Sequence, residues 1–254
     1  MCLSLTRASM KLTKTQIVLI AVGCTLAALT IIAVGMSFYP FGLKDSDRLQ
    51  LYQLMKDVDE ILTRANVSYI VESGTLLGCV RHKGLIPWDD DLDIQVMHKD
   101  EKAFLALKPL FLAVGFDIRP APFGWRIQPN VKRPFAFPFC DVFITSFDSK
   151  SYTRNKNHSF EKCKFHVSEY YPIRRYDFGA ITVNGPAQGE LFLDRCYGDT
   201  WRDTWYKMFS HKFLYFQMPS PKKMKPDDYK AATPTGPLID RDWDALAAAA
   251  GKRK

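Results

Sequence analysis

The sequence predicts a mixed α/β domain, in which helices flank a mixed sheet, preceded by one transmembrane helix. Three observations support this prediction. Hydrophobic residues make up 47% of the 254 residues and charged residues 24%, which is ordinary usage for a globular chain. Helical and strand-like hydrophobic periods alternate along residues 45–197. One uncharged apolar run, from Ile17 to Phe38, is long enough to cross a bilayer.

The apolar run at residues 17–38 is predicted to be an uncleaved signal-anchor. About 20 helical residues span a hydrocarbon core of about 30 Å. A cleaved signal peptide is the competing interpretation, but its apolar region is usually only about 7–15 residues long. Arg7, Lys11 and Lys14 precede the run, so the positive-inside rule places residues 1–16 in the cytosol. We expect a single-pass type II protein of the Golgi or ER, held in the lipid bilayer through residues 17–38.

The net charge of +8 is concentrated at the two ends of the chain. The first 14 residues carry +3 and residues 222–254 another +3, which leaves only +2 for residues 15–221. A nearly neutral domain does not indicate a face that binds a polyanion. We therefore expect no nucleic-acid partner, whereas a homo-oligomer stays open.

Residues 45–215 are predicted to form the folded domain. Its first helix, 45–65, has Leu51, Leu54, Met55 and Val58 at spacings of three and four residues. Further helices are expected at 73–80, 100–114 and 186–197, and strands at 67–72, 91–97, 116–119, 125–128, 139–147, 173–178 and 180–183. Residues 148–165 are polar and predict a loop, and residues 216–254 have the composition of a disordered tail.

Two features agree with a lumenal domain. Asn66 and Asn157 begin Asn-x-Ser glycosylation sequons. Four cysteines of the predicted domain would face an oxidising compartment: Cys79, Cys140, Cys163 and Cys196. They allow three complete pairings among which the sequence does not choose, and the simplest expectation is one disulfide or none, with the remaining thiols buried.

The strongest chemical signal is a run of carboxylates at Asp89, Asp90, Asp91 and Asp93. On a strand, Asp91 and Asp93 would share one face, while Leu92 and its alternate neighbours face the core. Two ionised carboxylates on one face repel each other unless a cation lies between them. Mg²⁺ or Mn²⁺, which prefer oxygen ligands and bridge phosphate oxygens, would satisfy this arrangement.

Asp141 is the candidate third ligand, because it lies in the apolar run Phe139-Cys-Asp-Val-Phe-Ile, where an unpaired charge would be costly. We predict a metal site at Asp91, Asp93 and Asp141. The alternative is a turn of solvated aspartates, with Asp141 as a capping residue or as the partner of a buried arginine.

The residues before the acidic run are candidates for binding phosphate. Backbone N–H groups at a glycine–threonine turn that opens a helix can donate hydrogen bonds to phosphate oxygens, although an ordinary helix start gives the same pattern. A basic loop follows and is either a diphosphate-binding or a solvated segment. A tryptophan next to the acids either stacks on a base or packs the loop. These candidates are Gly74, Thr75, Arg81, His82, Lys83 and Trp88.

Three segments resemble the LicD/fukutin family, a branch of the nucleotidyltransferase-like fold. GTLLGCVRHKGLIPWDDDLDI, at 74–94, resembles the family's long signature. FCDVFIT, at 139–145, is similar to its later Asp-bearing strand, and GELFLDRCYGDTW, at 189–201, to its closing segment. The resemblance extends from about Leu49 to Trp205.

The resemblance implies metal-dependent transfer of a phosphorylated alcohol, such as phosphocholine or ribitol 5-phosphate, from a CDP-linked donor to a glycan acceptor. Asp89, Asp91 and Asp93 match the family's acidic triplet and Asp141 its later acidic position, so these four are the expected catalytic residues. Asp141 would serve as third metal ligand or as the base on the acceptor hydroxyl. Gly74 and Thr75 correspond to the turn beside the donor. The alternative function is a catalytically inactive accessory subunit of a glycosylation complex.

Overall fold

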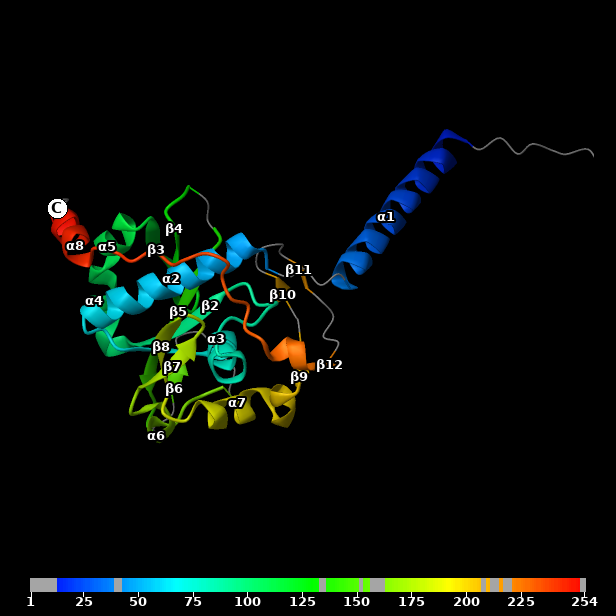
Figure 1. Cartoon of the computed structure of the whole chain (residues 1–254). Coiled ribbons are helices and arrows are strands. Elements are labelled where there is room, and N and C mark those ends of the chain that lie inside the picture. The colour runs from blue at the N-terminus through cyan, green and yellow to red at the C-terminus, as the bar shows by residue number, and fades with distance from the viewer. Residues whose placement is uncertain are drawn as a thin grey trace, which may run out of the picture. The chain divides into compact units, whose positions relative to one another are not determined.

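The chain is described by a computed structural model (Figure 1). It describes residues 13–38, 43–132, 136–150, 153–155, 163–206, 209–210, 215–216 and 221–251, without the side chains of 33–38, 154–155, 209–210 and 215–216. The chain divides into two compact units, Met1–Pro40 and Phe41–Lys254. The second unit has the predicted architecture, a mixed sheet flanked by helices.

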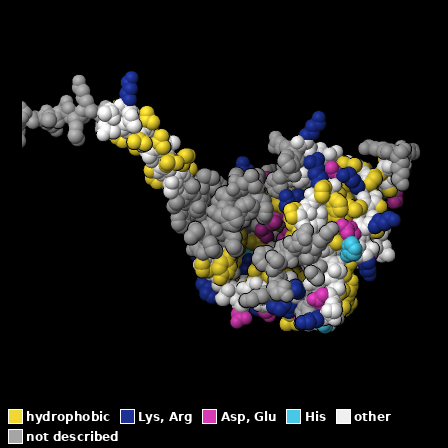
Figure 2. All heavy atoms as spheres, turned by 180° about the vertical axis from the view of Figure 1, so that it is seen from behind, with side chains coloured by type: hydrophobic (Ala, Val, Ile, Leu, Met, Phe, Trp, Pro, Cys, Tyr) yellow, Lys and Arg dark blue, Asp and Glu magenta, His cyan; other side chains and the backbone are white. Residues whose placement is uncertain are grey.

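The described part of the first unit is one helix, α1, from Lys14 to Phe38. Large apolar side chains point outward along it, with Leu19 66% and Ile31 71% exposed. Figure 2 shows these hydrophobic side chains following one another along the helix. A helix that is apolar on every face needs an apolar environment that the unit itself does not provide. Its length and composition suit a membrane span.

The second unit begins with helix α2, Asp45–Arg64. Asp47 closes a capping box with the backbone of Lys44, and its carboxylate accepts the Lys44 N–H at 3.2 Å. The predicted apolar stripe is confirmed, since Leu51, Leu54 and Val58 are fully buried. The stripe belongs to the same hydrophobic core as the strands of the main sheet.

The main sheet has the order β1–β2–β5–β4–β3, and β6 pairs with the C-terminal end of β5. The β2–β5 pair is parallel, whereas β1–β2, β5–β4 and β4–β3 are antiparallel. The central pair carries the acidic residues, so the topology decides which of them meet. The strands are β1 (Tyr69–Val71), β2 (Leu92–Met97), β3 (Phe116–Ala121), β4 (Gly124–Pro129), β5 (Cys140–Phe147) and β6 (Thr153–Asn155).

The remaining elements surround this sheet. A hairpin of β7 (Arg174–Phe178) and β8 (Ile181–Gly185) precedes helix α7 (Gly189–Tyr197). Short helices are α3 (Ser73–Leu77), α4 (Glu101–Ala106), α5 (Lys108–Ala113) and α6 (Val167–Tyr170). One turn of π-helix, Gly78–His82, continues α3, and 3-10 turns lie at His98–Asp100, Asp199–Arg202 and Pro226–Tyr229. Two-residue ladders pair β9 (Thr204–Trp205) with β12 (Lys222–Lys223), and β10 (Phe209–Ser210) with β11 (Tyr215–Phe216).

Two local predictions differ from the structure. The helix expected at 100–114 is interrupted at Leu107, because Pro109 lies in the first turn of α5 and lacks the N–H that a continuous helix would use. Part of the loop expected at 148–165 forms β6, which continues the sheet beyond the end of β4.

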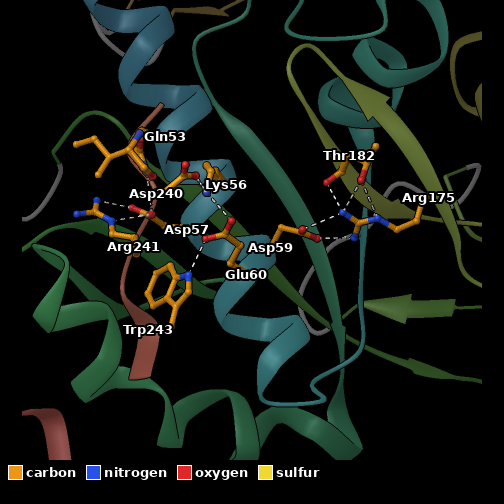
Figure 3. Close-up of polar contacts among 11 residues, drawn as sticks. Gln53, Lys56, Asp57, Asp59, Glu60, Arg175, Thr182, Asp240, Arg241 and Trp243 are labelled. Atoms are coloured by element: carbon orange, nitrogen blue, oxygen red, sulfur yellow. Dashed lines mark hydrogen bonds and ion pairs between the residues drawn. The ribbon is translucent and has the colours of Figure 1, made fainter. Parts of the chain in front are cut away.

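The C-terminal segment also differs from the expected disordered tail. Residues 238–243 lie along α2, as Figure 3 shows. Arg241 pairs with Asp57 at 2.8 Å, the Trp243 indole donates to Glu60 at 2.6 Å, and both Asp57 and Trp243 are buried. Helix α8, Trp243–Gly251, follows and packs against α5. Composition alone missed this docking because it depends on two side chains in a polar segment, Arg241 and Trp243, whose partners are distant in the sequence.

Candidate functional site

The acidic run ends where the central strand β2 begins. Leu92, Ile94 and Val96 are fully buried in the core, as the alternation predicted. Asp93 is therefore on the opposite face, and Asp89 and Asp91 precede it in the connecting segment. All three are half-buried. The local sequence thus brings several carboxylates to one end of a rigid strand.

Asp141 lies directly beside this run. Strands β2 and β5 are parallel and in a register that pairs Asp93 with Asp141. Paired residues of neighbouring strands place their side chains on the same face. The expectation that an adjacent strand supplies a further carboxylate is therefore met, and Asp141 is 5% exposed.

The Asp141 carboxylate is also bound by an arginine. Arg126, which lies opposite Asp141 on β4, donates to it from Nε at 2.5 Å and from Nη2 at 2.8 Å. The guanidinium lies over the Phe139 ring, 4.4 Å from its centroid. Asp141 thus has the arginine partner considered as the alternative to metal ligation. Arg126 was not a sequence candidate, because only the strand register brings it to Asp141.

The carboxylates perturb one another. Burial raises the pKa of Asp89 well above its ordinary value, and the charge of Asp91 and a hydrogen bond with it raise this pKa further. Burial also raises the pKa of Asp93, with added repulsion from Asp91, Asp141 and Glu72. Perturbed acids gathered at one place are typical of functional sites.

Glu72 is a further acid of this region that sequence reasoning missed. It is 4% exposed and accepts a hydrogen bond from the Gln95 side-chain amide. Its backbone N–H donates to the Asp93 carbonyl at 3.1 Å, which fixes it beside β2. The available signal was its position at the end of the β-rich run before the Ser-Gly-Thr turn.

Gly74 and Thr75 support the acidic run directly. A Cβ at Gly74 would lie 2.5 Å from the Asp89 carboxylate, so only glycine leaves room for Asp89 in its present position. The Thr75 hydroxyl accepts the Asp93 N–H at 2.8 Å and is buried. Both residues therefore position acids, and their binding to a donor phosphate stays a prediction.

Arg81 and His82 contact the C-terminal part of the chain. Arg81 donates to the Trp201 and Thr204 carbonyls, the latter at 3.3 Å. His82 Nε2 is 3.0 Å from the Asp228 carbonyl oxygen. Burial lowers the pKa of Arg81 to about 10, and burial together with the Arg81 charge lowers the pKa of His82 to about 4. These contacts join the loop at Arg81 and His82 to the backbone of the C-terminal part of the chain, and donor binding by either residue stays a prediction.

The other two loop candidates, Lys83 and Trp88, differ in their surroundings. Lys83 is exposed, and it takes a left-handed backbone conformation with φ of 59°. Trp88 packs against Trp205, with ring centroids 4.6 Å apart, and meets the His82 ring edge-on. Packing of the loop by Trp88 was one of its two interpretations, and stacking on a base stays a prediction.

Glu72, Asp89, Asp91, Asp93 and Asp141 together form what is called the acidic cluster below. Tyr197 is close enough for several of these charges to affect it, and it was not a sequence candidate. Burial of its hydroxyl and the charges of Asp93, Asp89 and Glu72 raise its pKa. The residue as a whole is nevertheless 40% exposed. The disulfide Cys163–Cys196 fixes the preceding residue at the end of α7. Among the other described cysteines of this unit, Cys79 and Cys140 are buried thiols.

The residues fit a divalent metal in chemistry, but their present geometry is not that of a coordination sphere. Asp89, Asp91 and Asp93 offer the hard oxygen donors that Mg²⁺ and Mn²⁺ prefer. The negative charges of these carboxylates repel one another, and a bound divalent ion would offset that repulsion. Within the described part of the chain, however, no three His, Cys, Asp or Glu residues stand ready to hold a metal. A bound ion would therefore require side-chain rearrangement.

The structure describes the asparagine of one of the two predicted glycosylation sequons. Asn66 is exposed just after α2, in a left-handed conformation with φ of 55°, so its side chain is accessible. Asn157 lies outside the described residues.

Comparisons with known proteins show what this chain is similar to. Residues 66–188 match the LicD/FKTN/FKRP nucleotidyltransferase domain. A Rickettsia typhi protein described as uncharacterized is 38% identical over 208 residues, 79% of this chain and 64% of that protein. An uncharacterized Rickettsia prowazekii protein is 36% identical over 201 residues, 76% of this chain and 72% of that protein. The lipopolysaccharide cholinephosphotransferase LicD of Haemophilus influenzae is 58% identical over 38 residues, 15% of this chain and 14% of that enzyme.

The mixed sheet, the acidic strand end and the matched segment define a nucleotidyltransferase-type domain of the transferase class. The chain belongs to the LicD/FKTN/FKRP family. It spans 64% of the length of the Rickettsia typhi relative, so that protein is longer than the part compared.

Proposed function

We propose that the protein transfers a phosphorylated alcohol, such as phosphocholine or a polyol phosphate, from a CDP-linked donor to a glycan, with Mg²⁺ or Mn²⁺ as cofactor. The observation that carries this proposal is the pairing of Asp93 with Asp141 across β2 and β5, beside Asp89 and Asp91. Family membership supports the transferase class. The name of the Haemophilus influenzae relative supports phosphocholine as one group to test.

Asp91 and Asp93 are the proposed residues for holding the metal, with Asp141 as the third carboxylate. When bound, the ion would neutralise charge on the donor diphosphate and so favour displacement of CMP. The chain's own contribution is positioning. Thr75 fixes the backbone of Asp93 through its hydroxyl, and Gly74 leaves room for Asp89.

In the proposed transfer, an acceptor hydroxyl oxygen bonds to the phosphorus that carries the alcohol. The bond from that phosphorus to the oxygen bridging to CMP breaks, and CMP leaves with the electron pair. Asp89 is our candidate for accepting the hydroxyl proton, because it is the one carboxylate of the acidic triplet that the proposed metal site leaves unassigned. Asp141 is a weaker candidate for the base, because Arg126 already engages both its oxygens.

The proposal is tested with the full-length chain in detergent. CDP-choline, CDP-ribitol and CDP-glycerol are each offered with Mn²⁺ and a mixture of glycan acceptors, and CMP release is measured. We expect release from one donor, its loss with EDTA, and its loss in the Asp91→Asn/Asp93→Asn double variant. Asp227→Asn, an exposed change in the C-terminal segment, is the matched control. Retained CMP release in the double variant would refute the role of these acids.

A second candidate is the catalytically inactive accessory subunit. The Arg126–Asp141 pair and the lack of three preformed metal ligands among the described residues favour it. Calorimetric titration with Mn²⁺ and CDP separates the two functions, because a transferase should bind both and a scaffold neither.

We also propose that α1 anchors the protein in a membrane, with the domain on the side away from the N-terminus. The basic residues before the helix and the exposed apolar surface of α1 support this orientation. A Golgi or ER membrane is the proposed location, although the relatives compared above are bacterial. A mobility shift on endoglycosidase treatment that Asn66→Gln abolishes would support the lumenal side, whereas protease digestion of the domain in sealed vesicles of cytosolic orientation would refute it.

A further inference from the structure

Arg126 and Asp141 form a rigid pair at one end of the acidic cluster. They are cross-strand partners on β4 and β5, and the guanidinium Nε and Nη2 contact the two different carboxylate oxygens. A two-point contact of this kind fixes the plane of the carboxylate as well as its position. Asp141 is thereby held in one orientation.

Aromatic rings hold Arg126 in turn. Its guanidinium lies 4.4 Å from the centroid of the Phe139 ring and 5.8 Å from that of Phe123. Phe139 is fully buried, and Phe123 contacts Phe143 with centroids 4.7 Å apart. Cation–π contacts in a partly buried place strengthen the hold on the arginine. The side chain is 21% exposed against 8% for Asp141, so solvent reaches the pair from the arginine side.

The pair is next to the carboxylates that the proposed metal would use. Asp93 is in register with Asp141 on the neighbouring strand, so the two side chains share one face of the sheet. A divalent ion between Asp93 and Asp141 would need an oxygen that Arg126 now engages. One carboxylate therefore faces two competing cations, the guanidinium and the ion.

We propose that Arg126 is a positioning residue that holds Asp141 when the metal is absent and yields one of its oxygens when the metal binds. This inference rests on the proposed metal-dependent function. The exchange keeps a positive charge beside Asp141 in both states, so this carboxylate has a counter-charge whether or not the metal is bound. It also accounts for the absence of a ready three-ligand set among the described residues.

The test is a double-mutant cycle read by Mn²⁺ affinity, with electron paramagnetic resonance on the full-length chain in detergent. Wild type, Arg126→Met, Asp141→Asn and the double variant are compared. Arg126→Met should bind Mn²⁺ about tenfold more tightly than wild type, since the competing cation is gone. In the Asp141→Asn background the same change should alter the affinity less than about threefold, because there is no carboxylate to compete for.

Arg119→Met is the matched charge control. Arg119 lies opposite Arg126 on β3 and pairs with Asp117, so its removal takes the same charge from the adjacent strand without touching Asp141. Its Mn²⁺ affinity should stay close to wild type. Arg126→Lys is the second variant if Arg126→Met fails to fold. It keeps the charge but loses the two-point contact, and it should bind Mn²⁺ more tightly than wild type.

The outcomes separate this inference from the proposed function. If wild type binds Mn²⁺ and Arg126→Met binds it no more tightly, the exchange is refuted while the metal site stands. An equal gain in both backgrounds also refutes it, because Arg126 would then act only through its overall charge. If neither wild type nor Arg126→Met binds Mn²⁺, the metal-dependent function fails and this inference fails with it.

Discussion

Asp93 and Asp141 lie opposite each other on the parallel strands β2 and β5, so two acids 48 positions apart in the sequence share one face of the sheet. Their charges disfavour each other, and burial raises the pKa of Asp93 further. A carboxyl with a pKa raised by folding stabilises the protein when protonated, and that stability is lost as the pH rises through the folded pKa. At neutral pH the metal-free site is therefore a source of instability.

Replacement of Asp93 by Asn should stabilise the metal-free protein at neutral pH. Removal of one charge from the cluster relieves the repulsion, and we expect Tm to rise by about 2–4 °C, the shift that 1 kcal/mol gives in a chain of this size. Mn²⁺ should raise the Tm of wild type and leave the variant unchanged. Thermal unfolding in EDTA and in Mn²⁺ measures both effects. A lower Tm for the variant in EDTA would contradict the repulsion.

Gly74→Ala should displace Asp89. The new Cβ would lie 2.5 Å from the Asp89 carboxylate, well inside contact distance, so the acid must move. We expect at least a tenfold loss of CMP release, because displacement of about 1 Å from the reacting geometry is costly. Gly236→Ala is the control, since its Cβ would meet only Leu49 at an ordinary 3.7 Å. Equal activity of the two variants would show that Asp89 has no role.

His82 should make the fold sensitive to mild acid. Its pKa is lowered to about 4 by burial, against about 6.5 in the unfolded chain, so its neutral form is the one that folds. Its contribution is complete above pH 6.5 and is lost as the pH falls toward 4, by about 3 kcal/mol. His82→Gln should remove this part of the pH dependence, whereas the exposed His98→Gln should not. The test is the free energy of unfolding of both variants and wild type, measured from pH 7.5 to 4.5. If the curves for His82→Gln and wild type run parallel, His82 is not the source of the acid sensitivity.

Arg241→Met should destabilise the domain by about 3 kcal/mol, because it leaves the Asp57 carboxylate buried without this partner. The exposed pair of Lys230 and Asp227 gives the control, and Lys230→Met should change stability by less than about 0.5 kcal/mol. Denaturant unfolding of both variants measures the difference. If Arg241→Met unfolds like wild type, residues 238–243 are not docked on α2 in solution.

The sequence predicted the features that depend on local pattern. The stripe of α2, the alternation of Leu92, Ile94 and Val96, and the acidic run at the start of β2 all follow from periodicity. Asp141 was found because a carboxylate in an apolar strand needs a partner.

The features that were missed depend on long-range placement. Arg126 meets Asp141 only through the register of β4 with β5, and Tyr197 reaches the acids only through the packing of α7. The C-terminal segment docks through Arg241 and Trp243, whose partners Asp57 and Glu60 lie more than 180 positions away in the sequence. The contacts of Arg81 and His82 were missed for the same reason, since the backbone carbonyls that they contact lie more than 100 residues away.

Calorimetric titration of CDP into the full-length protein, with Mn²⁺ and with EDTA, measures whether the acids bind the nucleotide through a metal ion. We expect CDP binding that needs Mn²⁺ and disappears in Asp91→Asn/Asp93→Asn, while Asp227→Asn binds as wild type does. Equal CDP binding in EDTA, or unchanged Mn²⁺-dependent binding by the double variant, would contradict it.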